Sequence, residues 1–147
     1  MSFKKILVGT DFSAGSRRAA EVAIEVAKLS GGLVRLIHGW EPFLYPRPLG
    51  DSFAPEPPIL AGIEEAAKAA LKEELAALQG KGIAVEGVMT MATPGDAVLA
   101  EAKRWGAELI VVGTHGRGGL ARVFLGSVAE RIIRAAEVPV LTTRTPK

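Results

Sequence analysis

The stretch from Val112 to Val128 has the residue types and spacing best suited to chemistry. Directly after an apolar run, four glycines fall within seven residues, at Gly113, Gly116, Gly118 and Gly119. Glycine lets the backbone adopt positive φ and approach a ligand closely, and successive amides in such a turn form a concavity for an anion. Gly126-Ser127 then opens a helical pattern, whose first amides and positive dipole end also suit phosphate. The stretch predicts a phosphate-binding loop, with the Ser127 hydroxyl as a further donor.

Other phosphate-binding motifs match this stretch less well. A P-loop ends in Gly-Lys-Ser/Thr, and this stretch contains no lysine. Gly116-x-Gly118-x-x-Ala121 matches the dinucleotide pattern, but it follows the fourth expected strand, and no acidic residue ends a later strand to hold a ribose. We attribute that match to chance. The remaining alternative is a flexible connector without a ligand.

Polar side chains near these glycines each have more than one possible role. Asp11 is either a helix cap or a contact to a ligand, and both roles can coexist. His115 is a phosphate donor, a bystander or a general base, and Arg117 either reaches a phosphate or is solvated. His38, at a strand end, is expected to be packed or hydrogen-bonded. The sequence has no Ser-His-Asp spacing and no paired carboxylates beside the loop, so no catalytic residue is assigned.

Composition excludes several classes of function. The net charge is +2 and no run of five like charges occurs, which disfavours a nucleic-acid surface. The absence of cysteine excludes disulfides, thiolate zinc sites and thiol catalysis. No stretch of eighteen apolar residues could span a membrane, and the short run Ile6-Leu7-Val8 suits a strand better than a signal peptide. We therefore expect a cytoplasmic protein.

Hydrophobic periodicity predicts one α/β domain over residues 1–147. Apolar runs predict strands at residues 6–9, 34–37, 83–90, 109–112 and 139–143, and amphipathic stripes predict helices between them, at residues 20–27, 60–79, 94–105 and 128–136. Residues 41–58 hold six of the nine prolines and predict a stiff surface loop. The alternation predicts a parallel sheet with helices on both faces. Ligands bind such sheets beyond the carboxyl ends of the strands, which points to the turns after the first and fourth strands.

The spacing Gly113-x-x-Gly116, nine residues, then Gly126-Ser127 resembles the signature of ATP-binding universal stress proteins. The opening Lys-Lys-Ile-Leu-Val-Gly-Thr-Asp-Phe-Ser and the closing Val138-Pro-Val-Leu also resemble that family, so the likeness covers nearly the whole chain. It implies an adenine nucleotide alpha hydrolase-like fold with a five-stranded sheet of order 3-2-1-4-5. It further implies ATP in a cleft at the strand ends and a homodimer paired through the last strands.

The resemblance also assigns site residues. It places ribose and phosphates against seven consecutive residues: Gly113, Thr114, His115, Gly116, Arg117, Gly118 and Gly119. Gly126, Ser127 and Val128 would close over the phosphates. Asp11 would meet the nucleoside, with Gly9 and Thr10 lining the cleft. The backbone at Gly39 would contact adenine, although the family more often has an apolar side chain there. Mg²⁺ or Mn²⁺ would bind through the phosphates.

Three functions remain open from the sequence. The leading hypothesis is a regulatory module that stores or senses ATP. A slow ATP hydrolase is the second, and an interaction protein that works without nucleotide is the third. No nucleic-acid or membrane partner is expected.

Overall fold

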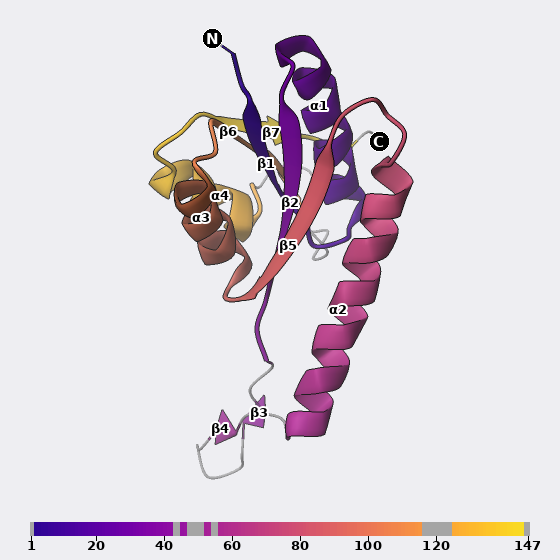
Figure 1. Ribbon diagram of the computed structural model, residues 1–147. Coiled ribbons are helices and arrows are strands. Elements are labelled where there is room, and N and C mark those ends of the chain that lie inside the picture. Colours follow the sequence, from indigo (N-terminus) through magenta and orange to yellow (C-terminus); the bar gives the residue numbers. More distant parts are fainter. Residues whose placement is uncertain (1, 43–44, 47–51, 54–55, 116–124, 146–147) are drawn as a thin grey trace.

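Five parallel strands form the central sheet of the computed structural model, which describes residues 2–42, 45–46, 52–53, 56–115 and 125–145. The strands are β1 (Lys5–Gly9), β2 (Leu33–Trp40), β5 (Val85–Met91), β6 (Leu109–Gly113) and β7 (Val140–Thr143). They lie in the order β5-β2-β1-β6-β7 (Figure 1). Counted along the chain, these strands have the predicted order 3-2-1-4-5, so the predicted fold is confirmed.

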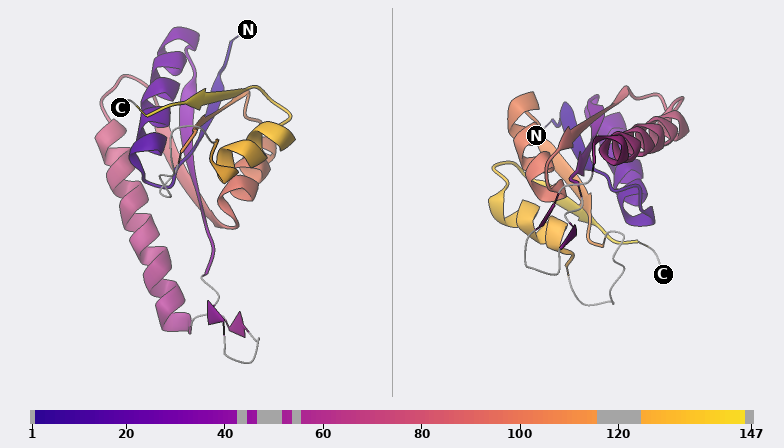
Figure 2. Two further views of the ribbon diagram at one scale, coloured as in Figure 1. Left: turned by 180° about the vertical axis from the view of Figure 1, so that it is seen from behind. Right: turned by 90° about the horizontal axis from the view of Figure 1, so that it is seen from below.

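Four helices cover the two faces of this sheet. Helices α1 (Ala14–Ser30) and α2 (Pro57–Leu78) pack on one face, and α3 (Pro94–Trp105) and α4 (Ser127–Ala135) on the other (Figures 1 and 2). Successive side chains of a strand point to opposite faces. Accordingly Ile6 and Val8 are buried in the core with α1, whereas Leu7 is buried in the core with α3 and α4.

Helix ends largely follow the sequence signals. Ser13 is the N-cap of α1, and its hydroxyl accepts a hydrogen bond from the Ser16 amide at 3.3 Å. Gly31 ends that helix with a φ of 67°. Thr93 occupies the N-cap of α3, before Pro94, but its side chain caps no backbone amide. The Thr93 hydroxyl instead hydrogen-bonds the Asp96 carboxylate.

The proline-rich segment 41–58 is more regular than the predicted loop. Strand β3 (Tyr45–Pro46) pairs antiparallel with β4 (Ser52–Phe53), and α2 already begins at Pro57. Proline is compatible with both positions, since the first turn of a helix needs no amide partner and a two-stranded ribbon has open edges. Prolines therefore mark the borders of these elements.

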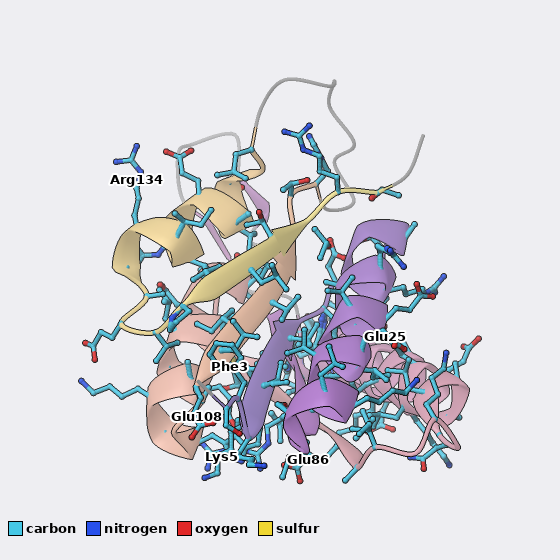
Figure 3. The ribbon with its side chains drawn as sticks, turned by 90° about the horizontal axis from the view of Figure 1, so that it is seen from above. Phe3, Lys5, Glu25, Glu86, Glu108 and Arg134 are labelled. Carbon is cyan, nitrogen blue, oxygen red and sulfur yellow. The ribbon has the colours of Figure 1, made fainter. Side chains whose placement is uncertain are left out.

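The amino-terminal end of the sheet, opposite the expected site, is closed by polar contacts. Figure 3 shows Lys5 beside Glu108, and the Glu108 carboxylate accepts the backbone amides of both Lys4 and Lys5. The Lys5 ammonium donates to the Trp105 carbonyl at 3.0 Å. The predicted glycine-rich turns lie at the carboxyl ends of the strands.

Candidate functional site

The turn after β1 is built around Thr10, whose polar groups all have partners inside the protein. Its amide donates to the Ile37 carbonyl at 3.0 Å, and its own carbonyl accepts from His38 Nδ1 at 2.8 Å. The Thr10 hydroxyl lies 3.0 Å from both carboxylate oxygens of Glu74 and 3.1 Å from the Ser16 hydroxyl. Thr10 thus holds this turn together, with its side chain hydrogen-bonded to Ser16 on α1 and Glu74 on α2.

Next to Thr10 the backbone is strained. Phe12 has a φ of 64°, the only positive φ at a non-glycine residue in the described part of the chain. It is held there because its amide donates to the Thr10 hydroxyl and its ring packs against the His38 ring. The two ring centroids lie 4.3 Å apart, with the ring planes tilted by 35°. The Asp11 carboxylate accepts the Ser13 amide at 3.0 Å, a local turn before the helix, whereas the N-cap of α1 itself is Ser13. Strain of this kind is concentrated at functional sites in proteins.

Glu74 is a part of this turn that the sequence analysis missed. It is only 7% exposed, on the sheet-facing side of α2. Burial raises the pKa of the Glu74 carboxyl, while the hydrogen bond from Thr10 and the charge of Arg17 lower it less. A signal was present in the sequence, because Glu74 lies three residues after Leu71 and four before Leu78, on the apolar side of the helix.

The turn after β6 lies directly against the start of α1. A Cβ on Gly113 would come within 2.9 Å of the Gly15 backbone, and a Cβ on Gly15 within 2.4 Å of the His115 carbonyl oxygen. Two backbone segments can approach this closely only because both positions are glycine. The turns after β1 and β6, the first and fourth sheet strands along the chain, are therefore neighbours, as predicted.

The positive φ expected of the glycines after β6 is not found at Gly113. Gly126, which the sequence placed at the start of the last helix, is its N-cap and has a φ of −61°. A Cβ on Gly126 would lie 2.8 Å from the Thr114 carbonyl oxygen, so this glycine also makes room for the protein's own backbone. At each of these two glycines the absence of a side chain lets two backbone segments lie in contact, and these contacts fix the shape of the site. Gly116, Arg117, Gly118 and Gly119 lie outside the described residues.

Thr114 connects this turn to its surroundings. Its amide and hydroxyl both donate to the Thr143 carbonyl of β7, at 2.9 and 3.2 Å, and its carbonyl accepts the Gly126 amide at 2.7 Å. Its hydroxyl also lies 3.0 Å from His115 Nδ1. The other ring nitrogen, His115 Nε2, is buried with no hydrogen-bond partner, and among the described residues only the Thr143 hydroxyl shares that state. A buried polar atom without a hydrogen-bond partner costs free energy. A ligand that hydrogen-bonds to either of these two atoms would remove that cost.

Helix α4 begins at Ser127, as the sequence predicted, with Gly126 as N-cap and no side-chain cap. The first amides of a helix have no partner within it. Ser127 and Val128 are both exposed at this start. The helix therefore presents amides that have no partner within it, and a positive dipole end, next to His115.

Two other predicted site glycines have a packing reason of their own. A Cβ on Gly9 would come within 2.9 Å of Val98, and one on Gly39 within 2.6 Å of the Ala97 Cβ. Helix α3 thus fits closely against the ends of β1 and β2. Whether the backbone at Gly39 also meets a ligand stays a prediction.

Within the described residues, no group of three or more histidine or acidic side chains is placed to hold a metal ion. In the same part of the chain, no helix combines the length and hydropathy needed to cross a bilayer.

Comparison with known proteins gives the family. The model of the universal stress protein family matches residues 2–144. The chain belongs to the universal stress protein family. A universal stress protein of Methanocaldococcus jannaschii is 35% identical over 147 residues, which cover 99% of this chain and 84% of that relative. One from Thermus aquaticus is 34% identical over 148 residues, covering 97% of this chain and 99% of that relative.

Solved universal stress proteins share the architecture. One of them, crystallised in complex with cAMP, superposes with a TM-score of 0.71 at 26% identity, over 99% of this chain and 100% of that one. The family match thus confirms the expected membership of the universal stress protein family, while membership of its ATP-binding subgroup stays a prediction.

Proposed function

We propose that this universal stress protein binds an adenine nucleotide, ATP in the first place, beyond the carboxyl ends of β1 and β6. The observation that carries the proposal is the uncapped start of α4, which the bond from the Gly126 amide to the Thr114 carbonyl fixes beside the β6 turn. The family member crystallised with cAMP supports an adenine nucleotide as the class of ligand.

In this proposal the phosphates bind at the start of α4. The amides of Ser127 and Val128 and the Ser127 hydroxyl donate to phosphate oxygens, with Gly126 keeping that approach open. His115 lies beside this helix start. Its Nε2, which has no partner among the described residues, would donate to a phosphate oxygen in the doubly protonated ring, with Nδ1 donating to the Thr114 hydroxyl. Residues 113–119 surround the ribose and phosphates, and Asp11 with the backbone at Gly39 contacts the nucleoside.

Mg²⁺ or Mn²⁺ would bind mainly through the phosphate oxygens. Mg²⁺ at nucleotides is commonly held by one or two protein groups, phosphate and water. This agrees with the lack of a three-ligand acidic or histidine cluster in the described part of the chain.

The proposed role is that of a regulatory module that stores or senses ATP as a homodimer. Among the described residues the sheet ends at β7, which pairs there with β6 alone, and Leu141 of β7 is 36% exposed. An open apolar edge is normally covered or paired. Pairing of β7 with a second copy would cover it.

Isothermal titration with Mg-ATP tests the binding proposal in two variants of Ser127. In Ser127→Asp the carboxylate faces the helix start, which favours the helix by about 0.3–1 kcal/mol but repels phosphate. We expect at least about tenfold weaker ATP binding with unchanged or higher thermal stability. Ser127→Asn, of similar size and neutral, is the control and should bind far better than Ser127→Asp.

Thermal melts of the unmodified protein give an independent test. ATP at a hundred times its dissociation constant should stabilise the fold by about 2.7 kcal/mol. Absence of any shift, together with no nucleotide in mass spectra of the freshly purified protein, would overturn the proposal. Phosphate release above a mock preparation would instead favour the hydrolase alternative.

A further inference from the structure

A cavity lies between α1 and α2, on the face of the sheet away from α4. Its volume is about 370 Å³, within the range of small-molecule sites. Its walls combine an apolar surface with five charged side chains; the lining is Phe12, Arg17, Ala20, Glu21, Ala70, Glu73, Glu74, Ala77, Leu78 and Lys81. Figure 2 shows α1 and α2 side by side along this face.

Glu74 is the buried charged group of this lining. Its two carboxylate oxygens share one donor, the Thr10 hydroxyl, which has a single proton to give. No lysine or arginine in the described residues comes within 4.0 Å of the Glu74 carboxylate. A buried carboxylate without a cation is costly, so Glu74 has lone pairs available for a positively charged donor.

Arg17 provides the opposite charge nearby. It lies on α1 close enough to Glu74 for its charge to act on that carboxyl. No ion pair or side-chain hydrogen bond involves the Arg17 guanidinium in the described part of the chain, whereas the adjacent Arg18 pairs with Glu21 at 3.1 Å. The cavity therefore holds a carboxylate and a guanidinium that are neighbours without being bonded to each other.

We propose that this cavity binds a small α-amino acid with an apolar side chain. The ligand's ammonium group pairs with Glu74, its carboxylate with Arg17, and its side chain lies along Ala20, Ala70 and Ala77. An α-amino acid carries its two charges on one carbon, which suits two protein charges that lie close together. A simple amine would leave Arg17 unpaired beside a second positive charge, and a simple acid would bring a negative charge to Glu74.

Amide chemical shifts of the full chain, titrated with L-leucine, test this proposal. We expect saturable shifts at the cavity positions of α1 and α2. The analogues 3-methylbutylamine, which lacks the carboxylate, and 4-methylpentanoate, which lacks the ammonium group, should each bind at least about tenfold more weakly. Equal binding of either analogue, or no saturable shift with leucine, would overturn the proposal.

Two variants of α1 that each remove a positive charge separate a ligand contact from a change in the fold. Arg17→Gln should weaken leucine binding by about tenfold or more. Lys28→Gln, on the same helix, should bind like the parent, because Lys28 and its partner Glu25 lie outside the cavity lining. Glu74→Gln keeps an acceptor for Thr10 but removes the negative charge, so it too should lose leucine binding while remaining folded. Undiminished binding in Arg17→Gln and Glu74→Gln would contradict the assignment. The amino acid proposal does not rest on the proposed nucleotide binding. Titration of the same variants with Mg-ATP measures nucleotide binding separately from leucine binding.

Discussion

Two buried glutamates show how partners decide the charge of a carboxyl group. Glu74 and Glu101 are both 7% exposed. Burial raises the pKa of Glu74, and only the hydrogen bond from Thr10 and the charge of Arg17, which forms no ion pair with it, act to lower that pKa. Burial also acts to raise the pKa of Glu101, but hydrogen bonds from Arg104 and Arg35, at 2.6–2.8 Å, outweigh it and hold the pKa below its ordinary value. Equal burial thus produces opposite shifts.

The first prediction concerns how stability depends on pH in Glu74→Gln. Because the Glu74 pKa is raised above 4.5 in the folded state, folding favours the protonated form, and this carboxyl costs stability as pH rises from 4.5 through its folded pKa. Glutamine removes that cost and can still accept from Thr10. We expect the variant to be at least as stable as the parent at neutral pH, with the advantage vanishing in acid. Urea unfolding across that pH range measures the effect.

Glu101→Gln is the matched control with the opposite sign. The lowered pKa of Glu101 stabilises the fold at neutral pH, and that stability is lost as pH falls through the folded pKa. Its glutamine variant should therefore be less stable than the parent at neutral pH, by about 1–3 kcal/mol. If Glu74→Gln is destabilised to the same extent, the view of Glu74 as an underpaired carboxyl is wrong.

At the scale of elements, the candidate site depends on how closely the first turn of α1 approaches the turn after β6. Gly113 and Gly15 bring the two backbones together, and Gly126 brings the start of α4 onto Thr114. The phosphate-binding geometry proposed here is therefore a product of packing between helices and strand ends.

The second prediction is that Gly113→Ala destabilises the protein. The new Cβ would lie 2.9 Å from the Gly15 backbone, which has to move. Overpacking of this kind costs about 1–3 kcal/mol, and we expect weaker Mg-ATP binding as well, because α4 and α1 are displaced relative to each other.

Gly62→Ala is the control for this prediction. Gly62 is helical, in α2, with nothing within 4 Å of the added Cβ, so alanine should raise stability by about 0.5–1 kcal/mol. Denaturant unfolding of both variants decides between local overpacking and a general effect of losing glycine. An equal gain in stability at both positions would contradict the packing argument.

Much of this arrangement could be predicted from sequence. The sheet order came from the family resemblance, and each helix and sheet strand from an amphipathic stripe or an apolar run, although α1 begins at Ala14, well before the predicted stripe 20–27. Gly126-Ser127 correctly located the start of α4. The close contacts of Gly113 and Gly15 could not be predicted, because they join segments far apart in the chain. Glu74 was missed for a similar reason, since a glutamate on a helix gives no sign that its partner is Thr10, 64 positions away.

At the scale of the whole molecule, the exposed edge at β7 leads to the third prediction. If two copies pair through β7, Leu141→Lys places charges of one sign at the contact and removes apolar burial. We expect sedimentation equilibrium to show a dimer for the parent at micromolar concentration and at least about tenfold weaker association for the variant. Leu29→Lys changes a leucine that is 91% exposed on α1 and should leave association unchanged. A monomeric parent would refute the proposed dimer.

The position of β1 at the centre of the sheet has a consequence for synthesis on the ribosome. Its first neighbour, β2, follows soon after it, but its second, β6, appears only when residue 109 has been made, where Leu109 pairs with Ile6. A nascent chain that ends after β5 can already place α1 and α2 on one face. Leu7 and Ile37 on the opposite face must await α3 and α4. Non-local parallel pairing is slow and leaves apolar surface open meanwhile. We therefore expect chains stalled at this length to be held by chaperones, and released chains of the same length to aggregate.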